Sequence, residues 1–393
     1  LSQDEFSSQS EKLEEYLENI HDRNQGFYNI LDDESVIGEI QRFADAARGK
    51  YENVVVLGIG GSSLGAICLE QSLTHLYGEN GDNPDLHVVD NIDPTIIDEL
   101  EEMIDLESTM FITVTKSGST SETLSLYYYF RNKLEEQDLP VREHMVFVTD
   151  PVNGMLRDIA NEEGITSFSI PPNVGGRFSV LTSVGLLPAA MIGIDIKELI
   201  SGAKEMREKF LSKDFDQNLS FQLAFVQYLL NQKGKIINVM MPYAQKLIRL
   251  ADWYRQLLAE SIGKAENEDG EEVYVGITPV NALGATDQHS QAQLYNEGPN
   301  DKLIMFIEVD DLGEKKDIPV LNPDRETTEF LKGSSFNDLI KVEKEATQQA
   351  LVERDRPTMT ISIDRVDENH IGQLFMLFEC ATAFLGEFFN INA

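Results

Sequence analysis

Two short segments combine glycines with hydroxyl side chains, and together they could bind a phosphate group. Residues 58–65 read Gly-Ile-Gly-Gly-Ser-Ser-Leu-Gly, and residues 115–123 read Thr-Lys-Ser-Gly-Ser-Thr-Ser-Glu-Thr. Glycines let an anion approach backbone N–H groups, and hydroxyls can donate hydrogen bonds to its oxygens. The first segment is also consistent with a simple tight turn. In the second, Ser119 and Glu122 have the spacing of a helix capping box.

Neither segment matches a nucleotide-binding loop. The dinucleotide pattern G-x-G-x-x-G would need a glycine at position 63, which is Ser63. The acidic residue after the next predicted strand, Asp90, lies beyond the usual spacing of about 20 residues. The P-loop pattern G-x-x-x-x-G-K-[ST] does not occur. A nicotinamide-dependent oxidoreductase is therefore disfavoured, and no cofactor is predicted.

Three further residues have types and neighbours that suit acid–base chemistry. Glu260 follows the apolar residues 257–259, and apolar surroundings favour the neutral form of a carboxyl group, which suits a base working near neutrality. Arg177 follows two glycines, and His289 lies in a polar segment after Gly284. Without further information these would be a surface glutamate, a salt-bridged arginine and an ordinary histidine. The six histidines lack the H-x-x-x-H spacing, so no metal site is predicted.

The elements that must position these residues alternate between strand and helix. Short apolar runs predict buried parallel strands at 53–57, 86–89, 110–114 and 145–148, with a helix over 123–134 between two of them. A second series begins near residue 218, with strands predicted at 236–239, 303–307 and 358–363 and an amphipathic helix over 244–258. The fold class is therefore α/β, with two doubly wound parallel sheets. We expect a helical segment over 1–50, domains over 51–200 and 215–365, and a C-terminal helix over 366–393.

Four motifs resemble those of the phosphoglucose isomerase family. Residues 115–123 are similar to the phosphate loop of the sugar-isomerase (SIS) domain, and residues 173–185, Asn-Val-Gly-Gly-Arg-Phe-Ser-Val-Leu-Thr-Ser-Val-Gly, resemble the first family signature along their whole length. The resemblance continues at residues 259–264 and 286–290. It implies two SIS-type domains, usually in a homodimer. It also implies a metal-independent isomerase that interconverts an aldose phosphate and a ketose phosphate through a cis-enediol.

The resemblance also assigns roles to individual residues. Glu260 would be the base that moves the proton, Arg177 would stabilise the enediolate oxygen, and His289, supplied by the neighbouring subunit, would assist ring opening. The phosphate would be held by Ser62, Thr115, Ser117 and Thr120. The remaining predicted substrate contacts are Gly61, Lys116 and Gln288. The lysine-bearing second signature of the family does not occur within these residues, and we expect it to follow Ala393.

Composition limits the partners and the compartment. Lys plus Arg is 32 and Asp plus Glu is 68, giving a net charge of −36 that disfavours nucleic acid and anionic membrane surfaces. No apolar run approaches 18 residues, so no transmembrane helix is expected, and residues 1–5 show no signal peptide. Cys68 and Cys380 have apolar neighbours, which favours a reducing compartment such as the cytoplasm.

One alternative from a different functional class remains at this stage. A non-catalytic SIS module that only senses a phosphosugar would need the phosphate loop but no base. The motifs around Arg177, Glu260 and His289 favour the enzyme.

Overall fold

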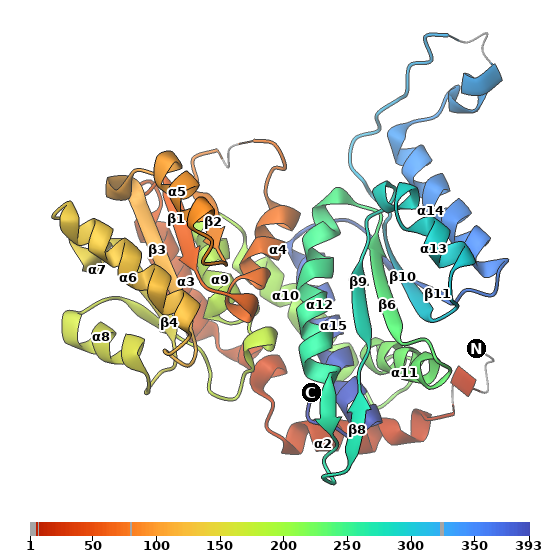
Figure 1. Ribbon diagram of the computed structural model, residues 1–393, viewed down its shortest axis with the longest axis horizontal. Helices are drawn as coiled ribbons and strands as arrows, with labels where there is room; N and C mark the ends of the chain where they lie inside the picture. The colour runs from red at the N-terminus through yellow and green to blue at the C-terminus, as the bar shows by residue number, and fades with distance from the viewer. Residues whose placement is uncertain (1–4, 7, 79–80, 323–325) are drawn as a thin grey trace.

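A first parallel sheet carries the two glycine- and hydroxyl-rich segments. The computed structural model describes residues 5–6, 8–78, 81–322 and 326–393. The order of this sheet is β2-β1-β3-β4-β5, with every neighbouring pair parallel (Figure 1). Its strands are β1 (Asn53–Leu57), β2 (Asp85–Val89), β3 (Thr109–Thr115), β4 (Met145–Thr149) and β5 (Ser167–Ser169).

Both faces of this sheet are covered by helices because its strands are apolar on both sides. In β1, Val54 and Val56 join the cluster that contains α3, α4 and α9, whereas Val55 and Leu57 join a separate cluster with α5, α6 and α8. Alternate residues of a strand point to opposite faces, so a continuous apolar run requires two layers of helices. These helices are α3 (Glu34–Ala47), α4 (Leu64–Leu73), α5 (Pro94–Met103), α6 (Ser121–Glu136), α8 (Met155–Glu163) and α9 (Ser183–Met191).

A second parallel sheet has the order β11-β10-β6-β9. Its strands are β6 (Ile237–Pro242), β9 (Thr278–Asn281), β10 (Lys302–Val309) and β11 (Thr358–Ile363). One face packs against α12 (Ile248–Ile262) and α15 (Glu368–Phe389), and the other against α13 (Ala292–Glu297) and α14 (Phe336–Val352). Between β10 and α14 the chain makes a long excursion that projects from the body of the molecule (Figure 1).

The long helix α15 is the centre of the largest core cluster. It packs against α10 (Ile196–Phe210), α11 (Leu219–Gln232) and α12, with aromatic contacts such as Trp253–Phe375. Among the described residues it is the one helix long and apolar enough to cross a membrane, but 94% of its most apolar stretch is buried within the protein. Glu379 and Glu387 interrupt its apolar run, which is why the sequence did not single it out. It is a core helix.

The predicted parallel sheets are confirmed, and the departures are local. The N-terminal segment contains α2 (Leu13–Asp22) and α3 joined by 3-10 turns. The strands β5 and β9 were missed, because Ser-Phe-Ser is too short to show a pattern and β9 contains Pro279. Proline is tolerated in β9 because this strand lies at the edge of the sheet. The acidic segment after α12 forms an exposed hairpin of β7 (Lys264–Glu266) and β8 (Glu272–Val275).

Candidate active site

The first sheet has a pocket at the point where its strand order reverses. β1 lies between β2 and β3, so the connections from β1 and β3 leave the sheet on opposite sides and open a crevice at their carboxyl ends. A pocket of about 480 Å³ lies there. That volume is within the range of small-molecule sites. The residues of both predicted phosphate segments that line it are Ile59, Gly61, Ser62, Thr115, Lys116, Ser117 and Thr120.

Three hydroxyls after β3 form a triangle. The Thr115 and Thr120 hydroxyl oxygens are 3.1 Å apart, and each lies 3.5 Å from the Ser117 hydroxyl oxygen. The predicted capping box was wrong, because the Ser119 hydroxyl donates to Ser117 and α6 begins at Ser121, one residue later than that motif requires. No side chain caps α6, so its first backbone N–H groups can donate to a ligand.

The loop after β1 is held against the arginine segment by a close backbone approach. Ser62 lies on the 3-10 turn η4 (Gly60–Ser62), which packs against a second turn, η6 (Gly176–Phe178). A Cβ atom at Gly61 would lie 2.3 Å from the Gly176 carbonyl oxygen, so only glycine fits there. This contact brings residues far apart in the sequence to the same pocket.

Arg177 and Glu260 meet at the wall of this pocket. Arg177 Nη1 lies 3.2 Å from Glu260 Oε1, and Gln256 Nε2, one helical turn earlier on α12, lies 3.1 Å from Glu260 Oε2. All three residues line the pocket. Burial lowers the pKa of Arg177 and the Glu260 carboxylate opposes that shift, but a guanidinium remains charged at neutral pH. A positioned carboxylate and a fixed cation thus lie beside the hydroxyl triangle.

The Glu260 carboxylate is more exposed than its apolar neighbours suggested. Its side chain is 54% exposed, whereas Leu257 and Leu258 are fully buried. The expectation of an apolar setting was wrong because residues of one helix point in different directions, and Glu260 leaves α12 on the side of the pocket. Lys264 donates to the Glu260 carbonyl at 3.2 Å and so caps the end of the helix.

The side chain of Lys116 is directed away from the hydroxyls. Its ammonium donates to the carbonyl oxygens of Pro172 and Val174, each at 2.8 Å. Both carbonyls belong to the segment that leads into Gly175 and Arg177. Lys116 therefore ties the phosphate segment to the arginine segment, and its predicted contact with substrate remains a prediction.

His289 and Gln288 do not line this pocket. They lie on the turn η8 (Thr286–His289), which follows β9 in the second sheet, and the His289 side chain is exposed. Gln288 Nε2 lies within hydrogen-bonding distance of the Tyr243 hydroxyl, the Glu343 carbonyl and the Thr347 hydroxyl, so it secures the turn. Within one chain these two residues are separate from the Glu260 carboxylate.

The structure adds three side chains that the sequence analysis missed. Gln256, Asp150 and Asn153 all line the pocket. Gln256 lies four residues before Glu260, and that spacing places two side chains on one helix face. Asp150 and Asn153 follow β4, so the rule that ligands bind beyond the carboxyl ends of strands pointed to them as well.

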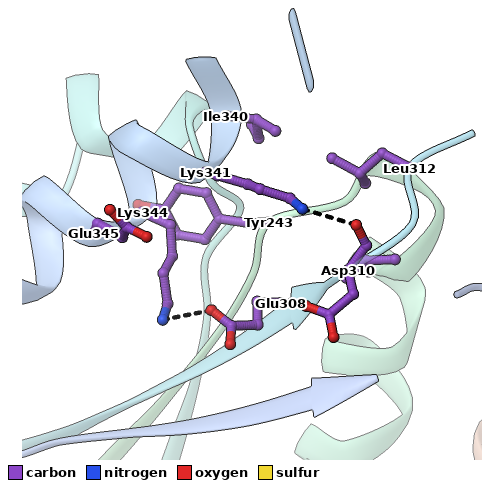
Figure 2. A pocket seen from close by; sticks show the side chains of 9 residues that line it. Tyr243, Glu308, Asp310, Leu312, Ile340, Lys341, Lys344 and Glu345 are labelled. Atoms are coloured by element: carbon purple, nitrogen blue, oxygen red, sulfur yellow. Dashed lines mark hydrogen bonds and ion pairs between the residues drawn. The ribbon is translucent and has the colours of Figure 1, made fainter. Parts of the chain in front are cut away.

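A second pocket lies at the corresponding position of the second sheet. There β6 lies between β9 and β10, and a pocket of about 240 Å³ is lined by Tyr243 after β6 and by Glu308 and Asp310 at the end of β10. Figure 2 shows that both lysines of this pocket bond to groups of the protein. Lys344 Nζ lies 2.6 Å from Glu308 Oε2, and Lys341 Nζ donates to the Asp310 carbonyl at 2.8 Å.

The part of the chain that the structure describes contains no group of three or more His, Cys, Asp or Glu side chains suited to a metal ion.

Comparison with known proteins identifies one family. The model of the family described as "Phosphoglucose isomerase" matches residues 32–393. A relative from Carboxydothermus hydrogenoformans, named glucose-6-phosphate isomerase, is 44% identical, and the match covers all of this chain and 87% of that protein. A relative of the same name from Rubrobacter xylanophilus is 39% identical over 86% of this chain and 78% of its own length.

Two solved structures share the fold. A hypothetical protein from Thermus thermophilus superposes with a TM-score of 0.90 at 34% identity, covering 99% of this chain and 92% of that one. A glucose-6-phosphate isomerase from Chlamydia trachomatis superposes with a TM-score of 0.79 at 24% identity, covering 91% of this chain and 69% of that one.

Proposed function

The chain belongs to the phosphoglucose isomerase family and is an enzyme that interconverts glucose 6-phosphate and fructose 6-phosphate, and we propose that it does so in the first-sheet pocket. The observation that carries this proposal is one pocket that combines hydroxyls and free helix N–H groups with a carboxylate held by a guanidinium. A sensor of phosphosugars would need only the first of these two parts.

The hydroxyl triangle and the start of α6 suit the phosphate group. Among the described residues, the hydroxyls of Thr115, Ser117 and Thr120 have hydrogen-bond partners only in their own loop, so their hydrogens can turn toward a ligand. Ser62 lines the pocket from the loop after β1. These donors carry no net charge, and this explains how a protein of net charge −36 can bind a dianion.

The pair of Arg177 and Glu260 suits the proton transfer. Isomerisation needs one base that removes the proton from C2 of the aldose and returns it at C1, on one face of a cis-enediol. In this proposal the Glu260 carboxylate is that base. Arg177, fixed beside it, stabilises the negative charge that develops on the substrate oxygen. Gln256 holds the second carboxylate oxygen and so orients the base.

A second copy of the chain would complete the site. His289 is exposed and lies outside the pocket of its own chain, which supports the proposal that it assists ring opening in the site of the neighbouring subunit. The projecting excursion between β10 and α14 exposes Leu321 by 85% and Phe330 by 71%, and a partner subunit would cover such side chains. We therefore propose a homodimer.

The state of the two cysteines supports the proposed cytoplasmic compartment. Both thiols, Cys68 and Cys380, are buried and unpaired, and burial raises the pKa of the Cys68 thiol to about 12. Inert, reduced thiols are consistent with the cytoplasm.

We also propose a boundary between two domains near residues 200–215. This segment lies between the strands of the first sheet and those of the second sheet in the sequence.

A coupled assay tests the function directly. The purified chain, with any segment that naturally follows Ala393, is expected to form fructose 6-phosphate from glucose 6-phosphate, and the rate should be unchanged by EDTA. No product, or a rate lost in EDTA and restored by a divalent ion, would contradict the proposal.

Subunit mixing tests the shared site. Glu260→Gln and His289→Ala protomers are each expected to be nearly inactive, and a mixture that exchanges subunits should recover part of the activity. An exchanged mixture that stays inactive would argue against a site built from two chains.

A further inference from the structure

Ser261, next to the proposed base, makes the shortest polar contact to Arg177. Its hydroxyl oxygen accepts a hydrogen bond from Arg177 Nε at 2.6 Å, and Ser261 is fully buried. Neighbouring residues of a helix differ by about 100° in direction. Glu260 therefore faces the pocket, while Ser261 faces inward from the same turn of α12.

The two consecutive residues hold two edges of one guanidinium. Nε donates to Ser261 and Nη1 donates to Glu260, so the plane of the group is fixed by two points. A guanidinium is planar and its N–H groups point in set directions. Fixing the direction of Nε therefore also fixes the directions in which Nη1 and Nη2 point.

Arg177 has little else to hold it in place. It lies on the three-residue turn η6, whose packing against η4 places its backbone but does not hold the end of its long side chain. Its guanidinium carbon lies 5.6 Å from the centre of the Phe178 ring, a contact that allows sliding. A free arginine side chain has many rotamers, so an unanchored guanidinium would occupy several orientations.

We infer that Ser261 is a positioning residue that aims Arg177 at the reacting oxygen. This inference rests on the proposed roles of Arg177 and Glu260. Ser261 does not line the pocket and acts only through the arginine. Its loss should lower kcat and leave KM nearly unchanged, because the phosphate is bound by the hydroxyl triangle and the start of α6.

The first test compares Ser261→Ala with a matched control. Ser261→Ala is expected to lower kcat roughly tenfold with KM within about twofold, because one hydrogen bond that matters in the transition state is lost. Ser261→Cys places a weaker hydrogen-bond acceptor at the same position, so its kcat should lie between those of the wild type and Ser261→Ala. Ser72→Ala removes another fully buried serine hydroxyl, one that donates to the Lys246 carbonyl outside the pocket, and should leave kcat unchanged.

A double-mutant cycle separates positioning from general packing. Lysine has no N–H group at the position of the arginine Nε, so Arg177→Lys loses the hydrogen bond to Ser261 and should itself lower kcat. Adding Ser261→Ala to Arg177→Lys should then cost almost nothing further. Losses that simply multiply would overturn the inference, and so would a Ser261→Ala enzyme with the wild-type kcat.

The outcome is distinguishable from failure of the proposed function. If Glu260→Gln is inactive and Ser261→Ala has the wild-type kcat, the inference fails and the proposed function stands. If Glu260→Gln remains active, the proposed function fails. The melting midpoint of each variant is measured by circular dichroism. All assays are run at a temperature below the lowest midpoint, so that every comparison concerns folded protein.

Discussion

The two sheets each open a pocket where the strand order reverses, but the two pockets treat their polar groups differently. In the first, the hydroxyls of the triangle bond only within their own loop, and α6 begins without a side-chain cap. In the second, Lys344 is paired with Glu308 and Lys341 with a backbone carbonyl (Figure 2). The first pocket has twice the volume of the second, about 480 against 240 Å³.

The difference shows that a reversal of strand order provides a crevice, but that ligand binding also depends on which polar groups line the crevice. Ligands bind where donors and acceptors are left without strong partners, because a ligand must replace whatever contacts exist. In the first pocket the triangle hydroxyls and the first N–H groups of α6 remain available to a ligand, whereas both lysines that line the second pocket, Lys341 and Lys344, are bonded to the protein itself. We therefore expect polar substitutions in the first pocket to change activity, and substitutions in the second to change stability.

The largest effect should come from Glu260→Gln. Glutamine keeps the size of the side chain but cannot accept the proton, so kcat should fall by ~10²–10⁴-fold with a much smaller change in substrate affinity. Exchange of the substrate C2 hydrogen with solvent should be lost in parallel, as measured by NMR. Because the side chain is 54% exposed, the melting midpoint should hardly change. A glutamine variant that still exchanges this hydrogen would show that another group is the base.

Loss of a triangle hydroxyl should mainly weaken binding. Thr120→Val keeps the shape of the side chain but removes its hydroxyl, and KM should rise by roughly 10- to 150-fold, since a hydrogen bond to a charged group is worth about 1.5–3 kcal/mol. The control is Ser125→Ala on α6, because the Ser125 hydroxyl donates to the Ser121 carbonyl and does not line the pocket. Equal changes of KM in the two variants would show that the hydroxyl triangle does not bind the phosphate.

The second pocket should show the opposite response. The side chain of Lys344 is 8% exposed and that of Glu308 is 33% exposed, so Lys344→Met leaves a partly solvated carboxylate without its cationic partner. We expect the free energy of unfolding to fall by about 1–3 kcal/mol, discounted for the exposure of Glu308, with unchanged kcat per folded molecule. Urea unfolding and the coupled assay measure the two quantities. A large loss of kcat with full stability would mean that the second pocket serves catalysis.

The smallest effect concerns the pH dependence of this ion pair. Burial alone would raise the pKa of Glu308, but hydrogen bonds from Lys344 and Ser362 hold it below the ordinary value of 4.5. A lowered pKa in the folded state stabilises the protein above the ordinary value, and this stabilisation is lost as the pH falls through the folded value. Glu308→Gln should therefore be less stable than the wild type at pH 7. That gap should shrink as the pH falls below the ordinary value of 4.5 and through the lowered pKa of the folded state. A gap that is constant with pH would show that the pair contributes no charge-dependent stability.

The sequence by itself determined the features that depend on neighbours in the chain. The apolar runs of β1, β3, β6 and β10 specify buried strands, because a strand apolar on both faces has to lie inside a parallel sheet. The spacing of hydroxyls over 115–123, the glycines before Arg177 and the position of Glu260 at a helix end are likewise local patterns. Gln256 was within reach of the same reasoning, since it lies one helical turn before Glu260.

Tertiary structure alone decided which of these patterns meet and in which direction their side chains point. The contact of Arg177 with Glu260 and Ser261 joins segments 83 and 84 residues apart, and the approach of Gly61 to Gly176 is set by the packing of two turns. The direction of Lys116, the exposure of Glu260 and the separation of His289 from its own pocket depend on the same packing. Local sequence patterns specify elements, whereas the distances between elements arise only when their apolar faces are buried together.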